Sequence, residues 1–157
     1  MKTLSETTRL DLIVEAVKYC QKMSLLGMPK ACYTKALREP VFFLWEAYGK
    51  TKVQAARYCS ESCLATGVDA SVRVYDHAIP FRFVEASLLG IDNPNPDSVR
   101  IILESKLITC LITRDEDKRL TSLGLSSKMP GDADESNYLA RYESAGIKVV
   151  PNPYYSA

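Results

Sequence analysis

The sequence has little of what marks a membrane or a secreted protein. Its apolar runs all fall short of the roughly 18 to 20 residues that a membrane span needs, and its first residues are polar and mixed in charge, unlike a secretory signal. It has no Cys-x-x-Cys pair, and its cysteines are odd in number: Cys20, Cys32, Cys59, Cys63 and Cys110. We therefore expect a cytoplasmic protein with reduced thiols, no disulfide framework and no membrane partner.

The rest of the composition is typical of an ordinary globular chain. The protein has 157 residues, of which 46% are hydrophobic and 25% are charged, as expected for one domain with a buried core. Helix signals fill residues 1–67, and strand signals enter only after them. We therefore predict a single α+β domain over residues 1–157, in which a helical N-terminal half (1–67) packs on a small β-sheet within residues 68–157.

Two capping-box spacings predict helix starts in the N-terminal part. Thr3 with Glu6, and Thr51 with Gln54, place a hydroxyl and a longer polar side chain three residues apart, so that each can satisfy a free backbone amide of the first turn. The second spacing predicts a helix that continues to about Ala65.

A further helix is expected between these two. Pro40 suits a first helical turn, and the apolar stretch 41–48 after it predicts a core helix centred on the aromatic run 42–45. Because Cys59 and Cys63 are four residues apart, a helix continuing from residue 51 would place both thiols on one face. Buried inert thiols are expected there, and a metal site is the alternative.

Alternating apolar residues and turn residues organise the C-terminal part. They predict strands over 71–75, 107–113 and 147–150, and helices over 80–89, 96–105, 114–123 and 137–145. The strand 107–113 is the clearest of these, because it is a continuous apolar run bounded by polar residues.

One motif in this part bears on chemistry. His77 is the only histidine, and it follows Asp76 at the end of the first predicted strand, with Pro80 three residues later. This stretch resembles the Asp-His-x-x-Pro signature of the HNH nucleases, including the HNH domain of CRISPR effector nucleases. In that family the Asp-His strand, a second strand and a helix form a ββα-metal fold. The resemblance implies such a ββα element here and a metal-dependent endonuclease that hydrolyses phosphodiester bonds.

The resemblance also implies roles for individual residues. His77 would be the general base that activates water, as a side chain with a pKa near 6.5 can be at neutral pH. Asp76 would bind magnesium, or manganese, and the other metal ligand would come from Asp117, or from Glu116 or Asp115. Two carboxylates suffice because magnesium keeps several waters. Guanidinium and ammonium groups suited to holding the phosphates are those of Arg114, Lys118, Arg119 and Arg141.

The charge distribution leaves the partner open. Residues 1–59 hold ten Lys or Arg and five Asp or Glu, although the net charge of the whole chain is only +1. A basic N-terminal part favours nucleic acid, with DNA as the expected substrate. A non-catalytic module that binds nucleic acid or protein on a degenerate HNH-like scaffold is the alternative. A thiol enzyme is a third hypothesis, with Cys110 on the neighbouring strand as the nearest thiol to His77.

Overall fold

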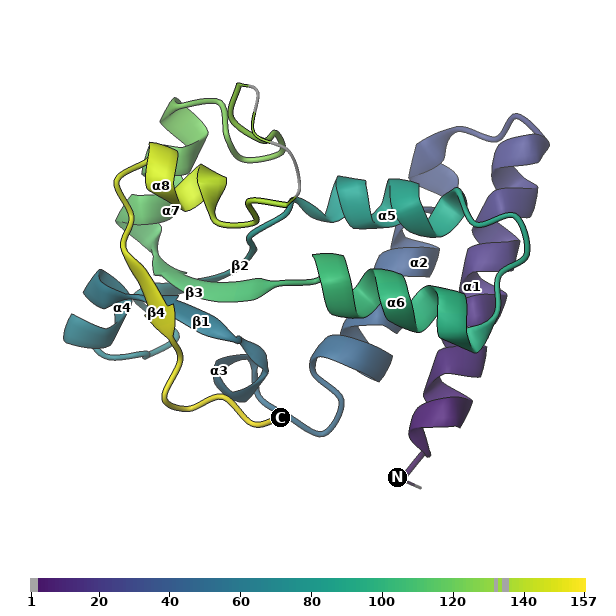
Figure 1. Ribbon diagram of the computed structural model, residues 1–157, viewed down its shortest axis with the longest axis horizontal. Helices are drawn as coiled ribbons and strands as arrows, with labels where there is room; N and C mark the ends of the chain where they lie inside the picture. The colour runs from purple at the N-terminus through teal and green to yellow at the C-terminus, as the bar shows by residue number, and fades with distance from the viewer. Residues whose placement is uncertain (1–2, 132, 134–135) are drawn as a thin grey trace. The chain divides into compact units, whose positions relative to one another are not determined.

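Four short strands form one mixed β-sheet in the part of the chain that the computed structural model describes, residues 3–131, 133 and 136–157 (Figure 1). The strand order is β2-β3-β1-β4. The bounds are Tyr58–Ser60 for β1, Arg73–His77 for β2, Thr109–Thr113 for β3 and Val149–Pro151 for β4. β1 runs parallel to β3, whereas β2 is antiparallel to β3 and β4 is antiparallel to β1. This mixed sheet, together with a helical N-terminal half, confirms the α+β class.

The helices and strands form two compact units. Unit 1 is residues 1–49 with 84–105, and unit 2 is residues 50–83 with 106–157. The helical elements are α1 (Glu6–Leu25), η1 (Lys30–Cys32), α2 (Thr34–Val41), η2 (Phe42–Glu46), α3 (Lys52–Ala55), α4 (Glu61–Ala65), α5 (Phe81–Leu89), α6 (Pro96–Lys106), α7 (Arg114–Ser122) and α8 (Ala140–Ser144). The sheet lies wholly in unit 2, and α1, α2 and η2 lie in unit 1. The single domain with a division at residue 67 stays a prediction.

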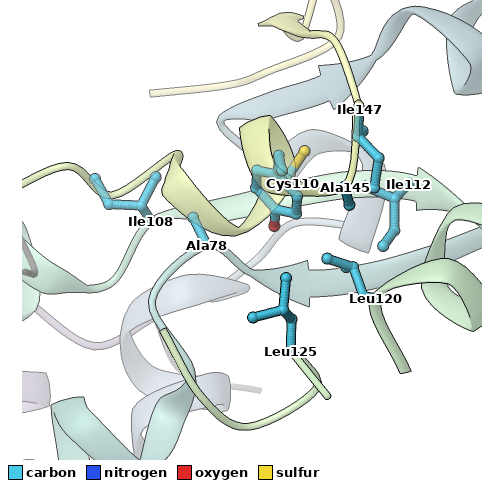
Figure 2. Close-up of a cluster of buried hydrophobic side chains, with 9 residues drawn as sticks. Ala78, Ile108, Cys110, Ile112, Leu120, Leu125, Ala145 and Ile147 are labelled. Atoms are coloured by element: carbon cyan, nitrogen blue, oxygen red, sulfur yellow. The ribbon is translucent and has the colours of Figure 1, made fainter. Parts of the chain in front are cut away.

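Each face of the sheet buries a separate apolar cluster, because successive side chains of a strand point to opposite faces. On one face, Cys110 and Ile112 of β3 pack with side chains from α7 and α8, including Leu120 and Tyr142 (Figure 2). On the other face, Leu111 packs with a small cluster that contains both Cys59 and Cys63. β3 is therefore buried on both sides, which explains why its sequence is a continuous apolar run.

The strand β1 was missed in the sequence, and the single helix expected from residue 51 to Ala65 is wrong. The capping box of Thr51 and Gln54 is present, but α3 ends at Ala55. The chain then extends through β1 and re-enters a helix at the N-cap Ser60. Cys59 thus lies on a strand and Cys63 on a helix, and they meet in the core rather than on one helical face.

Three other local predictions are corrected by the structure. The first helix is capped by Ser5, whose hydroxyl accepts the Thr8 amide, and not by Thr3. Pro40 lies near the end of α2 instead of opening a new helix. The chain after it continues as the π-helical turn η2, and Phe43 there is 59% exposed. The aromatic run 42–45 is therefore not the centre of the core.

Candidate functional site

Asp76 lies at the end of β2, opposite Cys110 of β3, on the sheet face that α7 and α8 cover. Its Oδ2 atom accepts a hydrogen bond from the Tyr142 hydroxyl at 2.8 Å and another from Nη1 of Arg141 at 3.1 Å. The Asp76 side chain is 19% exposed and that of Arg141 is 1% exposed. This is a largely buried ion pair reinforced by a phenol, and we call these three residues the Asp76 triad.

Arg141 is held by backbone carbonyls as well as by the Asp76 carboxylate. Its Nε donates to the Leu125 carbonyl at 2.7 Å, its Nη1 donates to the His77 carbonyl, and its Nη2 reaches the Ser126 carbonyl at 3.5 Å. The guanidinium thus ties the segment after α7 to the end of β2. A phosphate bound by Arg141 would have to displace these partners, and its phosphate-binding role stays a prediction.

Tyr142 completes the triad from the neighbouring position on α8. Burial and the nearby Asp76 carboxylate raise the pKa of Tyr142 well above its usual value. The phenol therefore stays protonated and donates a hydrogen bond to Asp76 throughout the physiological range. A carboxylate with a buried cation and a phenol donor on one oxygen is well suited to holding the sheet to α8.

His77 follows Asp76 in β2 and so points to the opposite face of the sheet. Its ring lies against two aromatic rings, at 5.9 Å from the Tyr75 centroid and 5.8 Å from the Phe81 centroid. The residue is buried. The sequence motif thus brings Asp76 and His77 together along the chain, but the pleat directs their side chains to opposite faces of the sheet.

The acids proposed as the other metal ligand lie in the first turn of α7. Asp76 is paired with Cys110, whereas α7 begins after Thr113, about 10 Å further along β3 at the usual rise per residue. Among the described residues, no three His, Cys, Asp or Glu side chains form a group suited to a metal ion. The metal roles of Asp76 and Asp117 remain predictions.

The cations expected to hold phosphates are engaged with nearby groups of unit 2. Arg114 donates from Nε to the Ser71 carbonyl at 2.7 Å, and Arg119 donates from Nη1 to the Ala145 carbonyl at 3.1 Å. Lys118 lies 3.5 Å from the Asp115 carboxylate, with both side chains exposed. All three lie on α7, at the other end of β3 from His77.

Glu116 has the most defined environment of the three acids. It is buried, and its Oε2 accepts the Ser60 hydroxyl at 2.6 Å and the Thr113 amide at 2.8 Å. Ser60 caps α4 and Thr113 caps α7, so one carboxylate joins two helix starts at the carboxyl ends of the parallel strands β1 and β3. The Thr-x-x-Glu spacing at 113–116 is a capping-box signal that would have indicated the cap of α7 from sequence alone, but not the bond to Ser60.

The cysteines divide into one exposed thiol and four buried ones. Cys32 is exposed, whereas Cys20, Cys59, Cys63 and Cys110 are buried. Burial, with the neighbouring Cys63, raises the pKa of Cys59 to about 11, and burial also raises the pKa of Cys110. Buried thiols with raised pKa values are poor nucleophiles, which opposes the thiol-enzyme hypothesis.

We expect one fast-reacting thiol per native chain in a titration with a chromogenic disulfide at pH 8. That thiol is Cys32, and the Cys32→Ser variant should lose the fast phase entirely. The other four should react only when denaturant is added, because their thiolates are disfavoured and shielded. A second fast thiol in the native Cys32→Ser protein would contradict this assignment.

No known protein family, curated protein or solved structure matches this chain. The HNH resemblance therefore stays a prediction that covers residues 72–124, of which only the motif at residues 76–80 is close. Within the described ranges, no helix is both long enough and apolar enough to cross a lipid bilayer.

Proposed function

We propose that this protein is a protein-binding module without nuclease activity, in which the Asp76 triad is structural. The proposal corresponds to the second of the functions that the sequence left open. The observation that carries it is the environment of Asp76. Its Oδ2 is occupied by Arg141 and Tyr142, whereas the adjacent His77 points to the other sheet face.

This arrangement is poorly suited to metal-dependent hydrolysis. A general base and the metal that binds the phosphate must act on the same few ångströms of substrate. A metal on the free side of Asp76 would lie on the α7–α8 face, whereas the His77 ring lies beside Tyr75 and Phe81 on the other. A buried guanidinium beside the carboxylate would also oppose a second cation there.

The surface of unit 1 favours protein over nucleic acid as the partner. Its residues include eight Lys or Arg and nine Asp or Glu, so the basic excess of residues 1–59 does not persist in the folded unit. Most of the large exposed hydrophobic side chains belong to it, namely Leu12, Tyr19, Leu25, Leu26, Met28, Phe43 and Ile101. Of these, Leu12, Tyr19 and Leu26 follow at seven-residue intervals along α1 and its C-cap and so share one helical face. A contiguous exposed apolar surface is typical of protein interaction sites, whereas nucleic-acid sites are basic.

The test is a plasmid-cleavage assay with magnesium or manganese, run beside a metal titration of thermal unfolding. We expect no metal-dependent cutting, which would be recognised because EDTA abolishes it. We also expect no saturable rise in the melting temperature of the protein as the metal concentration increases. A metal present at a hundred times its dissociation constant would stabilise the fold by about 2.7 kcal/mol, which such a titration resolves readily.

The nuclease remains a second candidate because the Asp76-His77 motif is present and the Asp76 side chain is not fully buried. The nuclease hypothesis requires EDTA-sensitive cutting that is lost in Asp76→Asn and retained in Glu104→Gln, which changes an exposed acid on α6. That result would overturn the binding-module proposal.

A further inference from the structure

The helix α1 has two apolar faces rather than one. Its buried face consists of Leu10, Ile13, Val14, Val17 and Cys20. A second set of apolar residues, which we call the outer seam, is formed by Leu12, Ala16, Tyr19, Met23 and the C-cap residue Leu26. At 100° per residue the outer seam lies well away from the buried face. Unit 1 therefore uses only one of the two apolar faces of α1 for its own core.

The outer seam is at least partly exposed along its length and regular in spacing. Leu12 is 46% exposed, Tyr19 is 48% exposed and Leu26 is 67% exposed, while Ala16 and Met23 are half-buried. Successive members are separated by four, three, four and three residues, the spacing with which two helices pack side by side. The seam spans about 21 Å along the helix at 1.5 Å per residue.

The polar side chains beside the seam indicate how a second helix would be oriented. Glu15 and Lys22 flank the same side of the seam, seven residues apart, and both are exposed; within the chain, Glu15 also pairs with Lys18 at 2.9 Å at the surface. When two copies of α1 pack antiparallel, Glu15 of each copy comes opposite Lys22 of the other, so the pairing occurs twice. In a parallel pair the two Glu15 side chains would lie on opposite sides of the interface, so neither could reach a Lys22 of the other copy.

The sizes of the seam residues agree with the same orientation. An antiparallel pair centred between Ala16 and Tyr19 sets Ala16 of each copy against Tyr19 of the other. The same alignment sets Leu12 against Met23. The small Ala16 thus faces Tyr19, the largest residue of the seam. Leu12 and Met23, which have similar volumes, face each other, and both pairings favour close packing.

We propose that the outer seam of α1 is a self-association surface on which a second copy of this chain docks antiparallel, with two-fold symmetry. This names the partner of the protein-binding module and so rests on the proposed function. An isologous contact of this kind closes on itself and yields a dimer, not a filament. The seam is short, so the dimer is a weak one, with a dissociation constant in the micromolar range, about 1 to 100 μM.

The experiment is sedimentation velocity of the full-length protein from 1 to about 500 μM, with circular dichroism of every variant to verify folding. Wild type should pass from monomer to dimer across this range. Tyr19→Glu should stay monomeric at every concentration. Ile101→Glu is the matched control, because Ile101 is an exposed apolar residue of the same unit on α6, and it should dimerise as wild type does.

Charge reversal tests the orientation. Glu15→Lys alone should raise the dissociation constant of the dimer at least tenfold, since it places lysines opposite each other twice. The double variant Glu15→Lys with Lys22→Glu should restore it to within about threefold of wild type. Failure of the double variant to restore dimerisation would exclude the antiparallel pairing.

Disulfide trapping gives an independent readout in a Cys32→Ser background. A mixture of Leu12→Cys and Met23→Cys proteins should cross-link on mild oxidation, while neither protein alone should. Cross-linking of each variant with itself would indicate a parallel pair and overturn the proposal, as would a folded wild type that is monomeric at 500 μM. A monomer that also cuts no plasmid refutes only self-association, whereas EDTA-sensitive cutting refutes the proposed function.

Discussion

Replacing Arg141 with methionine is expected to lower the free energy of unfolding by about 3 kcal/mol, the low end for breaking a buried ion pair. The guanidinium is 1% exposed and binds both the Asp76 carboxylate and backbone carbonyls from two segments. Methionine fills a similar volume but leaves these acceptors without donors, and unsatisfied buried acceptors carry their desolvation cost. The partial exposure of Asp76 keeps the loss from being larger.

Urea unfolding followed by circular dichroism measures this loss, and Arg114→Met is the matched control. Arg114 is exposed and makes its backbone hydrogen bond to Ser71 at the surface, so its replacement should cost under about 0.5 kcal/mol. A double variant, Asp76→Asn with Arg141→Met, should be less destabilised than Arg141→Met alone, because no carboxylate is then left without its cation and the amide oxygen can still accept from the Tyr142 hydroxyl. A loss below about 1 kcal/mol for Arg141→Met would show that the triad is not a structural tie.

The elements that the sequence specified best are those with strong local signals. β3 is continuous and apolar because both of its faces are covered, and the helices α5, α6 and α7 begin or end at residues whose chemistry suits a helix end. β1 carries no such signal. It is only three residues long, and it is stabilised by pairing with β3 and β4, which are distant in the chain. A strand that depends on non-local hydrogen bonds is not visible in a short window of sequence.

The candidate site illustrates the same limit at the level of single residues. Asp76 and His77 were linked because they are adjacent in the sequence, yet adjacency on a strand means opposite faces. The partners that Asp76 does have, Arg141 and Tyr142, lie 65 and 66 residues further along the chain. The sequence shows which side chains are available for chemistry, but only the pairing of β2 with β3 and the position of α8 decide which of them meet.

Replacing Glu116 with alanine is the second large effect, with an expected loss of about 2 to 4 kcal/mol in the free energy of unfolding. Its carboxylate accepts the Ser60 hydroxyl and the Thr113 amide, and it is buried. Alanine removes one half of a capping box, typically worth about 1 kcal/mol, and also leaves the buried Ser60 hydroxyl without its acceptor, which adds about 1 to 3 kcal/mol.

Two further variants separate the contributions of geometry and charge. Glu116→Gln keeps an acceptor oxygen at the same place, so it should retain the cap and lose only the strength that the charge adds, about 1 kcal/mol. Asp115→Ala is the matched control, because Asp115 is the neighbouring acid of α7 and its side chain is 88% exposed, and its loss should stay below about 0.5 kcal/mol. If Glu116→Ala and Asp115→Ala lower the free energy of unfolding equally, both acids act only through the favourable charge of any acid in the first turn of a helix. The carboxylate that joins Ser60 to Thr113 would then not be what holds the ends of β1 and β3 together.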